Sequence, residues 1–172
     1  MNTSAEQVGV LLQSSGGLLA TAESCTGGLV ADLLTSIPGA SEWYIVGWVT
    51  YSNEMKITQL GVDVNLIETH GAVSWQVAKA MCVGAMRQSG ATASLSTTGI
   101  AGPSGGSDEK PVGTVYLGCS VASETQIRGF RFSGTRDEIR ELAAITALQM
   151  MCYQLEGESV EMMCCQHGET IE

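Results

Sequence analysis

Apolar residues recur along this chain with two different periods, one typical of helices and one typical of strands. Helical spacing follows residues that can cap a helix, and the two outermost segments begin with a capping-box pattern at Ser4–Gln7 and Thr135–Glu138. Gly and Pro residues interrupt the pattern at the expected ends. We expect helices over residues 4–16, 29–37, 53–60 and 74–89 and from 135 to about 150, with a loop or single turn between 62 and 71.

Short runs rich in β-branched, aromatic or other apolar residues lie between these helices and predict strands. We expect the most aromatic of them, residues 43–51, to be a central strand, and the last two to form a hairpin that turns near Ser123. Helices that alternate with strands, plus one hairpin, predict an α/β fold: a single three-layer αβα domain with a mixed β-sheet. The expected strands are residues 18–20, 43–51, 93–98, 112–122 and 126–133.

Composition and charge narrow the possible partners. The chain has 172 residues, of which 8 are Lys or Arg and 18 are Asp or Glu, so its formal net charge is −10. This charge argues against a general nucleic-acid or anionic-membrane surface, because both need a cationic footprint. No run approaches the roughly 20 apolar residues of a membrane span, and we expect a cytoplasmic protein. The six cysteines show no zinc-site spacing, so we expect reduced thiols and no metal.

Three segments at expected strand ends carry candidate chemistry. Thr21–Gly28 is a strand-to-helix turn in which Ser24 could face an anion or oxyanion held by the free N–H groups of the helix. Gly99–Pro111 is a Gly- and Pro-rich loop, and Tyr51 ends a third strand with Lys56 shortly after it. If the three strands run the same way, a serine to attack, a lysine to take its proton and a tyrosine to orient it meet at one edge.

Each of these residues also has a structural interpretation. Ser24 or Thr26 could merely cap the helix, Tyr51 could be a surface aromatic of a strand, and Lys56 could be a solvated helix charge. Cys25 could itself be the nucleophile, or it could point inward.

Other charged side chains leave similar alternatives open. Arg136 could bind a phosphate or pair with Asp137 or Glu138. Glu23 could accept backbone N–H bonds that hold the turn, or assist the site electrostatically. Lys110 could be a loop charge only. Neither of the two histidines follows a motif that would make it the base of a Ser-His-Asp triad.

Six motifs together resemble the successive signatures of the CinA C-terminal domain family. The similarity runs in order from about Leu18 to Met151. The set is far more specific than any one member. The motifs are TAESCTGG at 21–28, VTYSNEMK at 49–56, HGAVS at 70–74, TGIAGPSGG at 98–106, KPVGTV at 110–115 and FSGTR at 132–136.

The resemblance implies a specific activity. Members of this family that act alone hydrolyse the carboxamide of nicotinamide mononucleotide, giving nicotinate mononucleotide and ammonia for pyridine nucleotide (NAD) recycling. Carried over by position, Ser24 is the nucleophile, and Tyr51 and Lys56 complete a catalytic set. No cofactor or metal is implied. The expected substrate-binding residues are Cys25, Thr26, Gly27, Gly28, Asn53, Gly99, Ala101, Gly102 and Arg136.

The resemblance also implies an oligomeric state, whereas the residues after Met151 have no counterpart in the family. Residues 1–155 are expected to form the amidohydrolase domain, and residues 156–172 an acidic, polar, flexible tail that contains Cys164 and Cys165. A homo-oligomer is expected. The alternative is a catalytically silent, nucleotide-binding or regulatory member of the same family, although a mere binder need not keep a nucleophile and a base together.

Overall fold

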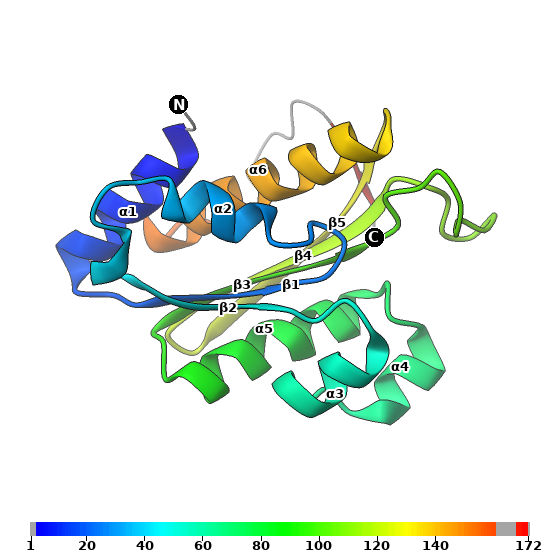
Figure 1. Cartoon of the computed structure of the whole chain (residues 1–172), viewed down its shortest axis with the longest axis horizontal. Helices are drawn as coiled ribbons and strands as arrows, with labels where there is room; N and C mark the ends of the chain where they lie inside the picture. The colour runs from blue at the N-terminus through cyan, green and yellow to red at the C-terminus, as the bar shows by residue number, and fades with distance from the viewer. Residues whose placement is uncertain (1–2, 161–167, 172) are drawn as a thin grey trace.

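A mixed six-stranded sheet forms the middle layer of the molecule (Figure 1). The computed structural model describes residues 3–160 and 168–171. The strand order is β2-β1-β3-β4-β5-β6; β1 pairs in parallel with β2 and β3, and the remaining neighbours are antiparallel. The strands are β1 (Leu19–Glu23), β2 (Tyr44–Val49), β3 (Ala93–Gly99), β4 (Thr114–Val121), β5 (Glu124–Phe132) and β6 (Gly168–Ile171).

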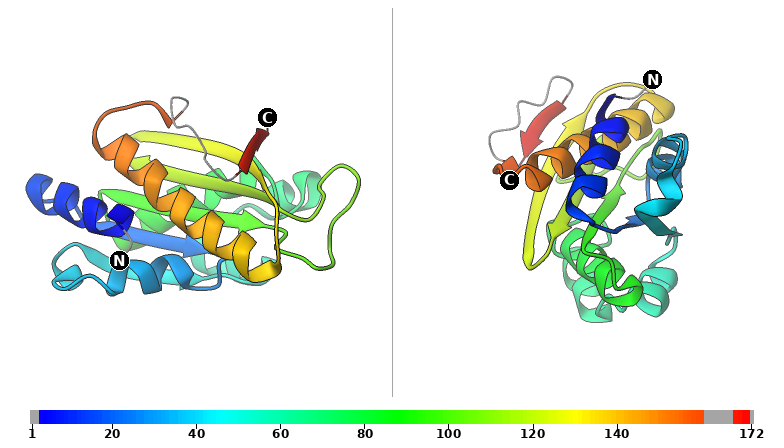
Figure 2. Two further views of the ribbon diagram at one scale, coloured as in Figure 1. Left: turned by 90° about the horizontal axis from the view of Figure 1, so that it is seen from above. Right: turned by 90° about the vertical axis from the view of Figure 1, so that its left-hand side faces the viewer.

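Helices cover both faces of the sheet. One layer contains α1, α2 and α6, and the other contains α3, α4 and α5, as Figure 1 and the turned views of Figure 2 show. This arrangement confirms the expected three-layer fold with a mixed sheet. The helices are α1 (Thr3–Ser15), α2 (Leu29–Thr35), α3 (Asn53–Leu60), α4 (Val64–His70), α5 (Trp75–Ser89) and α6 (Arg136–Leu155), with a short 3-10 helix, η1, at Ala40–Glu42.

Side-chain caps explain where most of these helices begin. The Ser52 hydroxyl accepts from Met55 N, the Ser74 hydroxyl accepts from Val77 N, and Thr135 forms the predicted capping box with Glu138. The capping box expected at Ser4 is wrong, because α1 already begins at Thr3. Residues 64–70 form a full helix rather than a single turn, since the Asp63 carboxylate caps it by accepting from Asn65 N.

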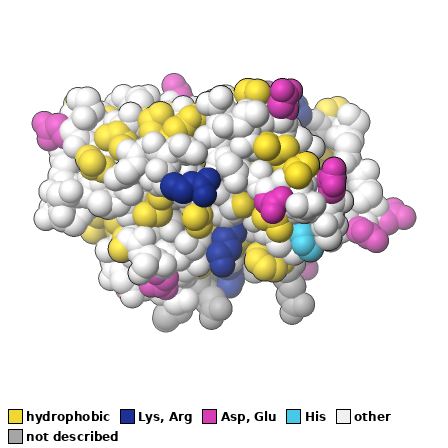
Figure 3. All heavy atoms as spheres, turned by 90° about the horizontal axis from the view of Figure 1, so that it is seen from below, with side chains coloured by type: hydrophobic (Ala, Val, Ile, Leu, Met, Phe, Trp, Pro, Cys, Tyr) yellow, Lys and Arg dark blue, Asp and Glu magenta, His cyan; other side chains and the backbone are white. Residues whose placement is uncertain are grey.

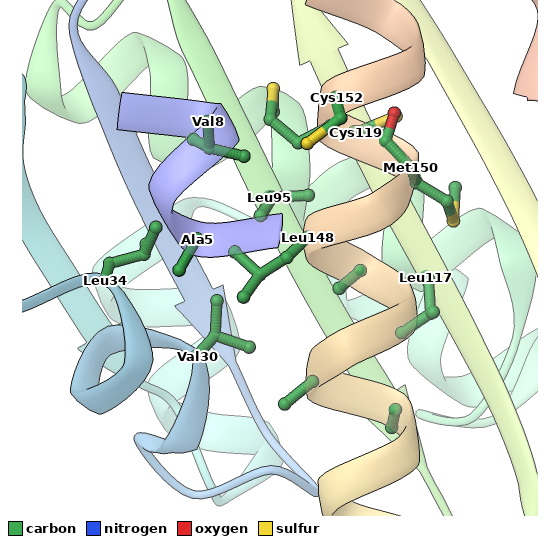
Figure 4. Close-up of a cluster of buried hydrophobic side chains, with 14 of the residues drawn as sticks. Ala5, Val8, Val30, Leu34, Leu95, Leu117, Cys119, Leu148, Met150 and Cys152 are labelled. Atoms are coloured by element: carbon green, nitrogen blue, oxygen red, sulfur yellow. The ribbon is translucent and has the colours of Figure 1, made fainter. Parts of the chain in front are cut away.

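Two apolar clusters fill the space on either side of the sheet. The larger lies under α1, α2 and α6, where Figure 4 shows Val8, Val30 and Leu148 pointing toward one another above Leu95 of the sheet. The smaller lies between the sheet and α3, α4 and α5. Small residues allow close packing here: a Cβ on Gly84 of α5 would collide with the backbone of Leu60. None of the helices in the described ranges is both long and apolar enough to cross a membrane.

The strand expected to be central, β2, lies instead at the edge of the sheet. Its side chains alternate between half-buried and exposed, as suits an edge position. The expectation was wrong because an aromatic, β-branched run indicates that the faces of a strand are covered by helices. It does not indicate whether the strand has a neighbour on both edges. Trp48 packs on the α5 side and Tyr44 on the opposite side, so both faces of this edge strand carry apolar contacts.

The expected flexible tail contributes to the fold. Val160 is buried, and Gly168–Ile171 pair with Gly129–Phe132 of β5. A free strand edge at β5 is an open row of hydrogen-bonding groups, and β6 covers it. Cys164 and Cys165 lie outside the described residues.

Candidate active site

The parallel strands bring three distant segments to one edge of the sheet. The carboxyl ends of β1, β2 and β3 lie together there, at the right-hand end in Figure 1, as expected for parallel neighbours. A cleft of about 220 Å³ opens between them. Eight of the expected site residues line it: Ser24, Cys25, Tyr51, Asn53, Lys56, Gly99, Ala101 and Arg136.

The side chains of Ser24 and Lys56 meet at the bottom of this cleft. Lys56 Nζ lies 3.0 Å from Ser24 Oγ and donates to it, and it also donates to the Thr50 carbonyl at 2.8 Å. Helix α3 begins three residues before Lys56, so the side chain reaches back under the end of β2. Only 1% of Lys56 and 9% of Ser24 are exposed. The residues resemble a nucleophile and its base in both distance and burial.

Burial lowers the pKa of the Lys56 ammonium below that of an exposed lysine. Among the described residues, Arg140 and Asp137 form the single ion pair, so no carboxylate offsets the desolvation of Lys56. Burial therefore makes the neutral amine easier to form than in an exposed lysine, and a neutral amine can accept the hydroxyl proton of Ser24.

The turn around Ser24 is held from below by Glu23. The Glu23 carboxylate, 1% exposed, accepts from the N–H groups of Gly28 (3.0 Å), Val30 (3.1 Å) and Ala31 (2.9 Å). The helix N-terminus that we expected to be free for an anion is thus already filled. Of the two roles considered for Glu23 from the sequence, the one observed is the binding of backbone N–H groups that hold the turn. The acid precedes the serine in the chain, while its side chain points to the other face of the sheet.

The backbone N–H groups of Cys25 and Ala101, two of the lining residues, can donate to a ligand. Among the described residues, the N–H groups of Cys25 and Ala101 donate to no other residue, whereas Gly27 N donates to the Ser24 carbonyl. One belongs to the Ser24 turn and the other to the loop after β3. Such a pair can bind an oxyanion.

Tyr51 and Arg136 form the outer rim of the cleft. Arg136 donates to the Tyr51 hydroxyl at 2.8 Å and to the Gly102 carbonyl at 2.7 Å, which links the segment after β2 to the loop after β3. Tyr51 is 59% exposed. Its hydroxyl is directed to Arg136 and not to Ser24. The alternative pairing of Arg136 is not formed, since Asp137 bonds to Arg140 and Glu138 caps α6.

Cys25 faces the apolar core from the same turn. It is 6% exposed and belongs to the larger core cluster. Desolvation raises its pKa to about 12, so the thiol stays protonated at neutral pH. A protonated, buried thiol is a poor nucleophile, and this disfavours Cys25 as the attacking group.

Four expected binding residues do not border the cleft: Thr26, Gly27, Gly28 and Gly102. Thr26 is fully buried and bonds to Glu23 and Thr97, while Gly102 acts through its carbonyl. Beyond Cys25 the turn faces the α2 layer, where Gly27 lies near the Arg140 side chain and Gly28 near the Val49 side chain.

Three lining residues carried no assigned role in the sequence: Ala72, Val73 and Thr98. Thr98 Oγ1 donates to the Ala72 carbonyl at 2.8 Å, and Lys110 Nζ donates to the His70 carbonyl at 2.7 Å. Lys110 is therefore more than a loop charge. The motifs at 70–74 and 98–106 were the available signal, but residues without reactive groups suggest no chemistry by themselves. In the described ranges, no His, Cys, Asp or Glu residues gather as a metal site would require.

Comparisons with known proteins identify the family of this chain. A family model described as CinA C-terminal domain matches residues 1–155. A CinA-like protein of Citrifermentans bemidjiense is 48% identical over 146 residues, which are 85% of this chain and 35% of that protein. A CinA-like protein of Acidobacterium capsulatum is 52% identical over 140 residues, 81% of this chain and 34% of that protein. The chain thus spans about a third of the length of these relatives.

Solved structures agree with the sequence comparisons. The crystal structure of a competence/damage inducible protein from Agrobacterium tumefaciens matches with a TM-score of 0.87 and 41% identity, covering 90% of this chain and 94% of that one. A CinA superfamily protein from Klebsiella pneumoniae matches with a TM-score of 0.87 and 31% identity, covering 91% and 98% of the two chains.

Proposed function

The chain belongs to the CinA C-terminal domain family, and we propose that it hydrolyses the carboxamide of nicotinamide mononucleotide to nicotinate mononucleotide and ammonia. The observation that carries the proposal is the buried contact of 3.0 Å between Lys56 Nζ and Ser24 Oγ at the bottom of the cleft. A lysine of lowered pKa beside a serine suits acyl transfer without a histidine. The reaction would recycle pyridine nucleotides in the cytoplasm.

The proposed reaction proceeds through an ester on Ser24. Neutral Lys56 takes the hydroxyl proton as Ser24 Oγ attacks the amide carbon, and the tetrahedral oxyanion accepts bonds from Cys25 N and Ala101 N. The C–N bond then breaks, and Lys56 returns its proton to the departing ammonia. Water attacks the resulting ester of nicotinate mononucleotide while Lys56 takes its proton. The ester C–O bond then breaks, Ser24 Oγ takes the proton from Lys56, and the carboxylate product leaves.

Charge supports the choice of substrate. The pyridinium ring of nicotinamide mononucleotide is cationic, which suits a chain with a net charge of −10, and a cation near Lys56 favours the neutral amine. We place the 5′-phosphate at the rim, where Arg136 has its guanidinium group and Asn53 lies nearby in the lining. Tyr51 then orients Arg136 or the bound nucleotide and is not the immediate base.

Ammonia release from nicotinamide mononucleotide tests the proposal, with nicotinate mononucleotide identified by mass. We expect release by the wild type, and loss of release in Ser24→Ala and in Lys56→Ala with the fold intact by circular dichroism. Ser14→Ala and Lys79→Ala change exposed residues on α1 and α5 and serve as matched controls that keep activity. A well-folded wild type that releases no ammonia from any amide nucleotide would favour the catalytically silent alternative.

We also propose that the chain forms a homo-oligomer through the open edge of β2. Residues 43–53 contain no charged side chain, and like-charged copies of this acidic chain can approach closely only where charge is absent. Among the described residues, three of the eight exposed large hydrophobic side chains belong to this part of the chain: Ile45, Val49 and Tyr51. On the face that carries α3, α4 and α5, apolar side chains reach the surface in several patches, and charged side chains lie near some of them (Figure 3).

An edge strand offers unpaired N–H and C=O groups, and a second β2 running antiparallel satisfies both copies. Ile45→Lys should therefore convert the oligomer to a monomer in sedimentation velocity. Val83→Lys introduces the same charge at a residue of equal exposure, 42%, on α5 and should leave the assembly intact. A wild-type monomer, or an oligomer unaffected by Ile45→Lys, would contradict this interface.

A further inference from the structure

We propose that Glu23 is a positioning residue of the active site, acting on Ser24 through the turn that it holds and not through contact with the substrate. The inference rests on the proposed amidohydrolase function. The carboxylate lies on the α2 side of the sheet, where it accepts from three backbone N–H groups of the turn and of α2. Ser24 follows it in the chain and contacts Lys56 of α3 on the other side.

A chain of hydrogen bonds connects this carboxylate to the backbone of Ser24. The Thr26 hydroxyl donates to Glu23 at 2.6 Å, and it lies 2.7 Å from the Thr97 hydroxyl. Because the Thr26 hydroxyl gives its one proton to Glu23, the Thr97 hydroxyl must donate to Thr26. The Thr97 carbonyl accepts from Ser24 N at 3.0 Å. The carboxylate therefore holds Thr26, which follows Ser24 in the chain, and through Thr26 it holds Thr97, whose carbonyl binds the Ser24 N–H.

Burial makes this arrangement rigid. Glu23, Thr26 and Thr97 are each at most 1% exposed, so water cannot replace a lost partner. The bonds to Gly28, Val30 and Ala31 occupy the donors at the start of α2 and leave the Cys25 N–H for the oxyanion. Small displacements of a nucleophile are costly, since reactivity depends on near-attack geometry.

Glu23→Gln tests the inference, because the amide keeps the shape but must turn an N–H₂ group toward a backbone N–H. We expect kcat to fall about 10-fold to 100-fold while KM changes less than about threefold, since the substrate contacts remain. Asp63→Asn is the matched control: Asp63 caps α4, a helix of seven residues like α2, and does not line the cleft. It should change stability only.

A second pair of variants covers a failure of Glu23→Gln to fold. Thr26→Val removes the hydroxyl that joins Glu23 to Thr97 and should lower kcat in the same way, whereas Thr26→Ser keeps the hydroxyl and should restore it. Unchanged kcat in folded Glu23→Gln or Thr26→Val, or a loss confined to KM, would overturn the positioning role.

Labelling of Ser24 by an aryl fluorophosphonate separates this inference from the proposed substrate. If the wild type is labelled at Ser24 but releases no ammonia from nicotinamide mononucleotide, the proposed substrate is wrong, and slower labelling of Glu23→Gln still supports the positioning role. Equal labelling rates in the two proteins would overturn it. If wild-type Ser24 reacts with neither reagent, both proposals fall.

Discussion

The two halves of the sheet share a common core but differ in what their strand ends carry. In the parallel half, β1, β2 and β3 end beside one another, and the segments that follow supply Ser24, Lys56 and the loop that contains Ala101. In the antiparallel half, β4 runs into β5 through a turn of two residues, Ala122 and Ser123, and neither residue borders the cleft.

Connection geometry explains this difference. A crossover must connect one parallel strand to the next, so the carboxyl ends of β1 and β2 lead into helices, and β3 leads into a long Gly- and Pro-rich loop before β4 returns antiparallel. These segments carry free backbone groups and reactive side chains. A hairpin returns at once and leaves no room for such groups. The antiparallel half instead contributes large core residues such as Phe130 and Leu117. We therefore expect substitutions in the parallel half to affect activity and those in the antiparallel half, apart from Arg136 after β5, to affect stability.

The largest effect on activity is expected from Lys56→Met. Methionine fills the buried space but cannot take the Ser24 proton, so kcat should fall on the order of 10³-fold or more. Lys79→Met, on the exposed face of α5, should leave kcat unchanged. Steady-state kinetics on folded protein would show the difference. An active Lys56→Met enzyme would contradict the role of Lys56 as the base that takes the Ser24 proton.

Phe130→Ala should produce the largest loss of stability. Phe130 is 1% exposed and stacks on Phe132 with ring centroids 5.6 Å apart, so its removal should lower the free energy of unfolding by about 3–5 kcal/mol. Urea denaturation measures this loss, and Ile127→Ala, half-buried on the same strand, should cost much less. A change in kcat per folded molecule of Phe130→Ala would break the distinction between the two halves.

Arg136→Met should raise KM for nicotinamide mononucleotide by about 10-fold to 100-fold, because a charged hydrogen bond to phosphate contributes roughly 1.5–3 kcal/mol. The riboside that lacks the phosphate should react equally well with both proteins. Arg131→Met, an exposed arginine of β5, is the control for lost charge. Equal losses with and without the phosphate would place the phosphate elsewhere.

The pH profile should follow Lys56. Its pKa is lowered by burial, so kcat/KM should rise about tenfold per pH unit until Lys56 is neutral and then level off below the usual lysine range. Stability has the same sign: between the lowered and the ordinary pKa, the unfolded chain binds more protons, so wild type gains stability relative to Lys56→Met as pH rises. If the difference in urea midpoint between wild type and Lys56→Met did not change with pH, it would contradict a lowered pKa of Lys56.

The smallest effect is expected at Cys25, next to Ser24 in the parallel half. Cys25→Ala should keep kcat within a few-fold, because its thiol is protonated and faces the core. This variant refines the comparison between the two halves of the sheet. It tests whether a residue of the parallel half affects activity when its side chain points to the core and not into the cleft. Loss of activity comparable with that of Ser24→Ala would restore Cys25 as a candidate nucleophile.

Local signals were sufficient to predict most of the fold. Caps at Ser52, Ser74 and Thr135 act over three residues and are readable in sequence, and so is the hairpin turn near Ser123. The edge position of β2 and the pairing of residues 168–171 depend on which strands meet across the whole chain. No local pattern encodes those partners.

The sequence predicted the residues of the candidate site that carry reactive or charged groups. It did not predict the residues that only shape the cleft. Ser24, Lys56 and Arg136 stand in motifs at strand ends, and the structure brings all three to the cleft. The orientation of the turn residues was not predictable, because Thr26 and Gly28 face away only once Glu23 has bound the start of α2. Ala72 and Val73 line the cleft without any reactive group, so no sequence pattern identifies them as site residues.

Mass spectrometry of the intact protein, quenched in acid during turnover of nicotinamide mononucleotide, tests the central claim most directly. The account predicts a population heavier by the acyl group of nicotinate mononucleotide, ribose phosphate included, carried by the peptide that contains Ser24 and absent from Ser24→Ala. An enzyme that turns over with no such adduct in rapid-quench samples, or with the adduct on Cys25, would contradict it.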